Sequence, residues 1–372
     1  MKSTIFDRRV IDHFDWMLIL LVAPIIGCSF YLIYEINVQL AYKQLAYILV
    51  AFGLFAFVFM LPIRRFAWLI PFGYWLGIAL LVAVELFGTM RMGAQRWLEL
   101  PFIHMTIQPS EIFKPFYIMM LAHTIHESPP PSSGYGWKPF FKLAFYILLP
   151  FVLIYREPDL GTALLLLLVG GCILIAVGLQ RKIWITLVLV CSLGGVFGFE
   201  VLLHDYQKKR IYDFISNESS YHVRQSIIAI GSGGLTGKES EGATQTQLRF
   251  LPISTSDFIF AYFVERFGFI GALGLIILYL LITLHLLSLT LKSDGDYLVT
   301  VTITGVATMI FLYMSINIAM TIGLAPVVGV PLPLFSHGGS SFINFIVLFA
   351  IIENLLAFRF GFLYTAALRS LE

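Results

Sequence analysis

The sequence predicts an all-α integral membrane protein with about ten transmembrane helices, in a single polytopic domain over residues 1–372. Hydrophobic residues make up 59% of the chain and charged residues only 12%, and the mean hydropathy is +0.87. Apolar runs of about 18 residues or more recur along the chain, and each can cross a hydrocarbon core of about 30 Å as a helix. These observations exclude a water-soluble globular protein.

The predicted spans follow one another along the whole chain. They lie at about 16–34, 44–62, 66–88, 110–126, 139–155, 162–180, 183–203, 258–289, 298–323 and 340–361. The fourth run is the least apolar, because it is interrupted by Glu111, Lys114, His123 and His126. The eighth run is longer than a bilayer requires. We therefore expect that helix to tilt, to protrude, or to bend at Gly268, Gly271 or Gly274.

Lysine and arginine residues indicate the orientation of these spans. If the N-terminus is inside, the inner segments carry 12 of the 24 lysine and arginine residues and the segment at 204–257 carries six, whereas the short outer loops hold only Lys43, Arg91, Arg96 and Arg156. This bias predicts that both termini are cytoplasmic. The charged N-terminus runs into a full-length span without a small-residue cleavage site, so we expect a retained first helix. The three cysteines all lie in apolar stretches and are interpreted as small core residues.

Polar residues gather on the predicted outer side. That side receives segments 88–111 and 155–162, a large extracytoplasmic loop at about 204–257 between the seventh and eighth helices, and segment 326–341. A transporter needs machinery that can be reached from both sides, whereas an enzyme acting on one leaflet needs it on one side only. The asymmetry therefore favours an enzyme.

Asp257 stands at the start of the eighth span, and Glu265 and Arg266 lie inside it. Asp257 either caps that helix or belongs to a site, since ionisable groups at membrane depth usually face a bundle interior or a wet cavity. Asp257 and Glu265 would lie about 80° apart around a helix and about 12 Å apart along it. They could therefore line one cavity, and Arg266 could neutralise a carboxylate on a neighbouring helix.

The sequence QPSE predicts the start of the fourth helix, with Pro109 in the first turn and Gln108 or Ser110 as the cap. Glu111 and Lys114 follow and are neighbours on one helical face. In one interpretation they form an ion pair that allows a polar helix to enter the membrane. In the other, the carboxylate of Glu111 holds the ammonium of Lys114 ready to bind a phosphate.

Two outer loops carry further candidates. Arg91, Arg96 and Trp97 follow the third span, and arginine suits bidentate phosphate binding. Two arginines against the positive-inside trend indicate an anionic substrate, although a tryptophan at an interface is common. Asp159 lies in REPDLGT (156–162), where it either caps the sixth helix or contributes to a site.

Two glycine-rich segments complete the candidates. Segment 228–247 lacks the spacing of a nucleotide-binding P-loop, and no strand precedes it. Segment SHGGSS (336–341) places Ser336 and Ser340 before the last span, where they either hold sugar or phosphate oxygens or cap that helix. His337 has no metal-ligand partner at a convincing spacing.

Six of these segments together resemble one family. GAQRW, QPSEIFK, EPDLGTA, GSGGLTGK, TSDFIFAYFVERFG and GVPLPLFSHGGSS occur in this order over nearly the whole chain. They closely resemble the SEDS family (shape, elongation, division and sporulation), its rod-shape members more than its division members. The chain departs from the family pattern at His337, where tyrosine is usual, and at GKES, where Gly-Lys-Gly is usual.

The resemblance implies a peptidoglycan glycosyltransferase of the bacterial cytoplasmic (inner) membrane. Such proteins polymerise lipid II, an undecaprenyl-diphosphate-linked disaccharide-pentapeptide, on the outer leaflet during cell elongation. They work with a class B penicillin-binding protein, a transpeptidase, among other membrane proteins of the elongation complex. The family's essential aspartate maps onto Asp257, its Arg-Trp pair onto Arg96 and Trp97, and its Glu-x-x-Lys pair onto Glu111 and Lys114.

The residues fit that chemistry. The acceptor's 4-hydroxyl must lose a proton as it attacks the anomeric carbon, and Asp257 is our candidate base. Direct displacement would invert the configuration. The departing diphosphate requires cations, which would be Arg91, Arg96, Lys114 or a divalent ion. Asp257 is therefore either the base or a ligand of Mg²⁺ or Mn²⁺ shared with diphosphate oxygens. We expect the lipid tail to lie in a groove between helices that is lined with aromatic residues.

Two other functions would suit parts of this pattern. A lipid II flippase would also need buried charges and a lipid-facing groove, but it would make no glycan. A non-catalytic scaffold of the elongation complex would tolerate replacement of Asp257.

Overall fold

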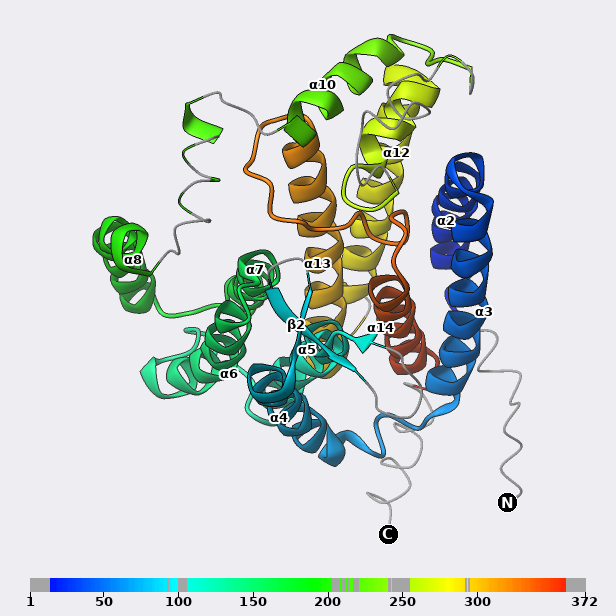
Figure 1. Cartoon of the computed structure of the whole chain (residues 1–372). Coiled ribbons are helices and arrows are strands. Elements are labelled where there is room, and N and C mark those ends of the chain that lie inside the picture. Colours follow the sequence, from blue (N-terminus) through cyan, green and yellow to red (C-terminus); the bar gives the residue numbers. More distant parts are fainter. Residues whose placement is uncertain are drawn as a thin grey trace, which may run out of the picture.

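The computed structural model describes residues 14–91, 94–99, 106–202, 221–239, 255–291 and 295–358, together with positions 208, 210, 212, 214–216, 242 and 293. A long helix coincides with each predicted span (Figure 1). These helices are α2 (Trp16–Ile36), α3 (Val38–Met60), α4 (Ile70–Phe87), α5 (Pro109–Glu127), α6 (Trp137–Arg156), α7 (Leu160–Val177), α8 (Arg181–Leu202), α12 (Ile259–Thr290), α13 (Tyr297–Thr321) and α14 (Gly339–Ala357).

Most of these helices could cross a bilayer. Within the described ranges, 8 helices are long and apolar enough to do so, counting the short 3-10 helix η1 (Ala67–Leu69) together with α4. Helix α5 is not among them, because its charged and histidine residues lower its hydropathy. It is nevertheless buried along nearly its whole length, because it packs against α4, α13 and α14 near the centre of the bundle (Figure 1). Neighbouring helices cover most of α5, which explains why its polar residues are tolerated.

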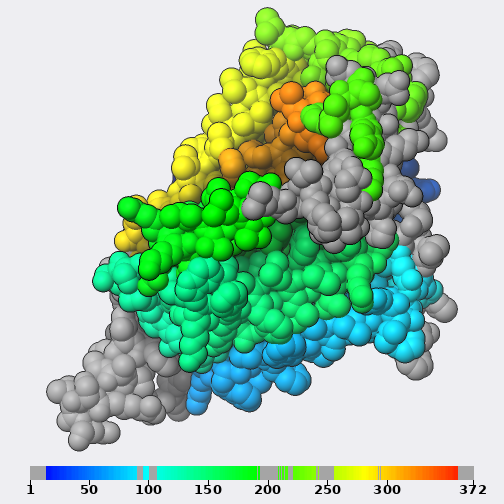
Figure 2. Space-filling model, turned by 90° about the vertical axis from the view of Figure 1, so that its left-hand side faces the viewer, coloured from blue at the N-terminus to red at the C-terminus, as the bar shows by residue number. Residues whose placement is uncertain are grey.

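Close packing around α5 depends on small residues of α4. A Cβ atom added at Gly73 or Gly77 would lie 2.5 Å from the ring of Phe116 or Phe113, respectively. Glycine therefore lets α4 approach α5 closely, as small residues do at many helix contacts in membranes. Figure 2 shows the face of the molecule on which α6, α7 and α8 lie. On this face, α13 and the loop after it, drawn in orange, reach the surface between α12 and α8.

The connections meet at two opposite ends of the bundle. At the inner end, the backbone N–H of Asp15 donates to Glu353 Oε2 at 3.0 Å, and Arg64 pairs with Asp296 at 2.7 Å. The start of α2 and the end of α14 therefore lie together, which agrees with an even number of crossings. Among the described residues, the outer end gathers 88–91, 94–99, 106–108, 156–160, 255–258 and 322–338. The cytoplasmic placement of the inner end remains a prediction.

Helix α12 contains the predicted bend. Gly268 has φ 66° and ψ −166°, outside the helical region, and divides α12 into two helical parts. The guanidinium of Arg266 pairs with Glu35 of α2 at 2.7 Å, so the predicted partner on a neighbouring helix is present. The backbone of segment 234–238 docks beside the bend, where Phe269 N–H donates to the Gly234 carbonyl at 2.9 Å. These contacts fix the first part of α12, which follows Asp257.

Two features of the outer end have no counterpart among the predicted spans. One is a small antiparallel sheet in the order β1-β2-β3, formed by β1 (Thr89–Arg91), β2 (Ala94–Glu99) and β3 (Thr106–Ile107). The other is α10 (Tyr221–Gly233), which lies in the predicted long loop and packs against α12. Most of the remaining part of that loop lies outside the described residues.

Candidate functional site

Asp257 lies where α12, α13 and the loop at 322–338 meet. The side-chain amide of Asn317, on α13, donates to the backbone carbonyl of Asp257 at 2.9 Å and to that of Val330 at 2.7 Å. The Ser336 hydroxyl donates to the Ser256 carbonyl at 2.7 Å. Helix α13 and the loop at 322–338 therefore hold the backbone at Ser256 and Asp257.

The carboxylate of Asp257 does not cap α12. The N-cap residue of that helix is Phe258, and the cap makes no side-chain hydrogen bond. Burial raises the pKa of Asp257, while a hydrogen bond from Ser256 and the charge of Arg210 partly offset this effect. A carboxylate with a raised pKa is a stronger base. Gly329 lies beside it, where an added Cβ would be 3.6 Å from Asp257 Oδ2.

A second polar cluster lies at the outer ends of α5, α6 and α7. Asp159 accepts the backbone N–H of Thr162 at 3.2 Å and caps α7, as one of the two interpretations predicted. The same carboxylate accepts from Gln108 at 3.3 Å and lies 3.7 Å from the guanidinium of Arg96. Arg96 also donates to the backbone carbonyls of Glu157 and Pro158. Its side chain remains 31% exposed and can still meet a ligand.

The predicted Glu111–Lys114 ion pair is present and buried. The ammonium of Lys114, whose side chain is 1% exposed, contacts Glu111 Oε1 and the hydroxyl of Tyr313. The second carboxylate oxygen of Glu111 and the hydroxyl of Ser110 have no hydrogen-bond partner among the residues that the structure describes. In this arrangement Lys114 neutralises Glu111 inside the bundle, and its ammonium does not face solvent.

One loop joins the two regions. A Cβ added at Gly161, in the first turn of α7, would lie 2.7 Å from the carbonyl of Val328. The next residue, Gly329, lies beside the carboxylate of Asp257. The Asp159 cluster and Asp257 therefore contact neighbouring residues of the same loop.

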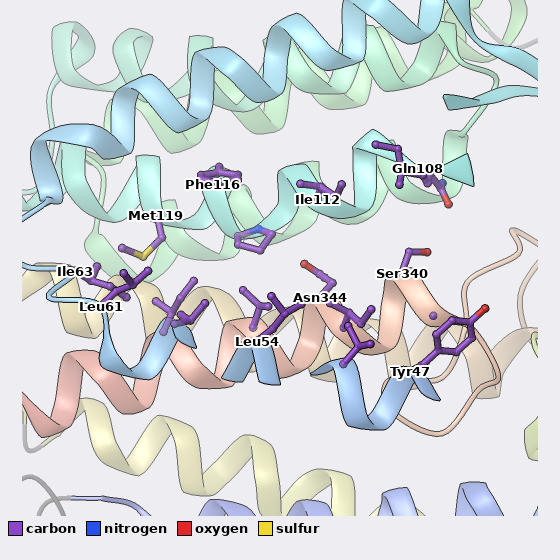
Figure 3. Close-up of a pocket in the computed structure, with 18 of the residues that line it drawn as sticks. Tyr47, Leu54, Leu61, Ile63, Gln108, Ile112, Phe116, Met119, Ser340 and Asn344 are labelled. Carbon is purple, nitrogen blue, oxygen red and sulfur yellow. The ribbon is translucent and has the colours of Figure 1, made fainter. Parts of the chain in front are cut away.

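A long apolar groove ends at this site. It has a volume of about 1170 Å³ and runs between α3, α5 and α14 (Figure 3). Trp97, Gln108 and Ser340 line its outer end, and Leu61 and Ile63 line its inner end. Most of the lining is aliphatic, and its aromatic residues are Tyr47, Phe66, Trp97 and Phe116.

The prediction of a cap at Gln108 or Ser110 is confirmed for the position of Gln108 only. Gln108 occupies the N-cap position of α5, but no side chain caps that helix; its amide binds Asp159 instead. Ser336 holds the backbone at Ser256 and does not cap α14, whose N-cap residue is Gly338. Ser336 therefore contacts the segment that carries Asp257, and Ser340 lines the groove.

The remaining predicted residues are placed as follows. Glu265 is buried in the first part of α12, and its carbonyl accepts the N–H of Lys238 at 3.0 Å. Arg91 ends β1, and its side chain lies outside the described residues. Our sequence reasoning missed Asn317, Tyr313 and Glu157 as parts of this region. Asn317 could have been identified from the sequence, because a side-chain amide inside an apolar run requires a buried hydrogen-bond partner.

Metal binding by protein residues alone has little support. Among the described residues, no group of three or more histidine, cysteine, aspartate and glutamate residues could hold an ion. A site built on Asp257 would supply one carboxylate, and Mg²⁺ commonly binds through one or two carboxylates together with substrate phosphates. The donor set therefore fits a divalent ion only when a phosphate ligand completes it.

The fold and the site together define a polytopic membrane protein with a half-buried carboxylate at the same end of the bundle as the outer end of an apolar groove. The sequence profile of the cell cycle protein family of FtsW, RodA and SpoVE matches residues 7–360. The chain belongs to this family, the SEDS family, and is a multi-pass protein of the bacterial inner membrane.

Relatives and solved structures agree with this assignment. The chain is 51% identical to peptidoglycan glycosyltransferase MrdB of Helicobacter pylori strain 26695, over 97% of this chain and 94% of that protein. It is 36% identical to MrdB of Escherichia coli K12, over 95% of each. The rod shape determining protein RodA of Thermus thermophilus has a TM-score of 0.70 and 25% identity, covering 93% of this chain and 98% of that one. A chain of a peptidoglycan synthase complex that couples polymerization and crosslinking has the same fold, with a TM-score of 0.81.

Proposed function

We propose that this chain is a peptidoglycan glycosyltransferase that polymerises lipid II into glycan strands on the outer leaflet during cell elongation. The observation that carries the proposal is the position of Asp257. Its carboxylate does not cap α12, and it lies beside Gly329, in the loop that leads to the groove-lining residues Gly338 and Ser340. The names of the MrdB relatives give independent support.

The groove suits the polyprenyl tail of such a substrate. Its lining is apolar over most of its length, and two of its lining residues, Val50 and Ile112, are exposed, so the groove is open. A tail that remains in the bilayer can therefore enter sideways between helices. The diphosphate and sugars would then lie at the outer end, near Trp97, Gln108 and Ser340.

The chemistry follows from the groups at that end. Asp257 takes the proton of the acceptor's 4-hydroxyl as the hydroxyl oxygen attacks the anomeric carbon, and the bond to the lipid diphosphate breaks with inversion. Arg96 keeps a part-exposed guanidinium next to Asp159 at the outer end, and it stabilises the departing diphosphate. In the alternative role, Asp257 would hold Mg²⁺ or Mn²⁺ together with the diphosphate, and such an ion would supply charge neutralisation for the leaving group.

The partner follows from the same proposal. One fold relative was solved as part of a synthase complex for polymerization and crosslinking. We expect this chain to work beside a class B penicillin-binding protein, which cross-links the strands that it makes.

A lipid II flippase is the second candidate, because the groove reaches from Leu61 and Ile63 at the inner end to Ser340 at the outer end. Product formation separates the two functions. Purified protein with labelled lipid II in detergent, with and without Mg²⁺ or Mn²⁺, should yield long glycan, whereas a flippase yields none. A complete absence of polymer, with the partner present, would refute the polymerase.

The groove can be tested by filling it. Leu54→Trp, inside the groove on α3, should lower glycan synthesis by about tenfold or more, because an overpacked site typically costs about 1–3 kcal/mol. Leu49→Trp is the matched control, because Leu49 lies on the same helix, does not line the groove and is 65% exposed. It should retain synthesis. Equal activity of the two variants would show that the tail does not occupy the groove.

A further inference from the structure

Glu157 is a buried acid that the proposed mechanism does not use. It follows the last residue of α6 and is only 2% exposed. Neither of its carboxylate oxygens has a hydrogen-bond partner within the described part of the chain. An ionised carboxylate is costly in such a place unless it is paired and hydrogen-bonded.

The charges around Glu157 do not pair with it. Arg96 of β2 directs its guanidinium to the backbone carbonyls of Glu157 and Pro158 and toward the carboxylate of Asp159. Glu85 of α4 faces the same region and pairs with Arg156 at 3.2 Å. Glu157 therefore lies close to two other acids, and the cation beside it is already shared with Asp159.

These surroundings keep a proton on Glu157. Burial, and then the charge of Asp159, raise the pKa of Glu157 to about 8, although Arg96 lowers it in part. Glu157 also stands at the C-terminal end of α6, where the helix dipole disfavours a negative charge. At neutral pH the carboxyl group is therefore mostly neutral.

We propose that Glu157 acts as a neutral carboxylic acid beside Arg96, and that the site accepts the anionic diphosphate of its substrate only while Glu157 holds this proton. This inference rests on the proposed function. While Glu157 is protonated, the charges of Arg96 and Asp159 neutralise each other. The guanidinium of Arg96 can then turn toward a phosphate group of the substrate. Loss of the proton adds a negative charge, draws the guanidinium to Glu157 and repels the diphosphate. Glu157 is thus a positioning residue that acts through Arg96.

The activity test compares pH profiles. Glycan synthesis by the wild-type protein should fall above about pH 8 and be about tenfold lower at pH 9 than at its maximum. Glu157→Gln keeps the shape of a neutral acid and cannot lose a proton, so it should be active and should lack this alkaline decline. An inactive Glu157→Gln variant, or one with the same decline as the wild type, would overturn the proposal.

A second readout does not depend on activity. Between pH about 4.5, the ordinary pKa of glutamate, and about 8, the folded protein holds this proton more firmly than the unfolded chain. The free energy of unfolding should therefore fall as pH rises through this range, and Glu157→Gln should lack that part of the fall. If the unfolding temperatures of the wild type and of Glu157→Gln changed with pH in the same way, the proposal that Glu157 holds this proton would be overturned. A wild type that makes no glycan would instead refute the proposed function, whatever the stability profiles show.

Discussion

Replacement of Asp257 by asparagine or alanine is expected to abolish glycan synthesis from lipid II. Both variants lack a base, and loss of general base catalysis typically costs about 10²–10⁴-fold in rate. The loss is expected with or without added Mg²⁺, because neither replacement side chain supplies a carboxylate ligand. The measurement is the rate of polymer formation by purified protein in detergent.

The fold should survive these replacements. The backbone carbonyl of Asp257, not its side chain, accepts the hydrogen bond from Asn317, so the thermal unfolding temperature should remain close to that of the wild type. Glu127→Gln is a suitable control, because it removes an exposed carboxylate at the inner end of α5 and should retain synthesis. Glycan synthesis by either Asp257 variant at the wild-type rate would refute the catalytic role.

Replacement of Lys114 by alanine is expected to destabilise the protein by about 3–5 kcal/mol, because it leaves the carboxylate of Glu111 buried without a cation. The sequence left open whether Lys114 forms an ion pair or binds a phosphate, and the burial of Lys114 between Glu111 and Tyr313 favours the ion pair. Denaturant or thermal unfolding in detergent measures the effect.

A double variant separates the two roles of Lys114. Lys114→Met combined with Glu111→Gln removes both charges and should recover most of the lost stability, because replacing a buried pair is often nearly neutral. A single Lys114→Ala variant with wild-type stability and no activity would contradict the structural role. It would indicate that the ammonium binds the substrate.

The helices were predictable because their signal is local. Each apolar run is long enough to span a bilayer, and the excess length of the eighth run correctly indicated a bend, which the structure has at Gly268. The small sheet at 89–107 was not predictable, because its strands are short and lie in a loop, where pairing depends on register rather than on hydrophobic pattern.

The site was predictable only in part, for a similar reason. An acid at the edge of an apolar run is conspicuous, so Asp257, Asp159 and the Glu111–Lys114 pair could be identified from the sequence. Their neighbours could not, because Asn317 and Tyr313 meet them through tertiary packing of α13. The groove likewise exists only after α3, α5 and α14 have assembled.

The proposed reaction requires that Asp257 faces the outer surface beside the groove. Cysteine labelling in intact spheroplasts tests this, in a chain whose Cys28, Cys172 and Cys191 have been replaced. A membrane-impermeant maleimide should react with an Asp257→Cys variant from outside, and added lipid II should slow the reaction. A Glu127→Cys variant, at the inner end, should react only after lysis. Labelling of the Asp257→Cys variant only after lysis would contradict the account.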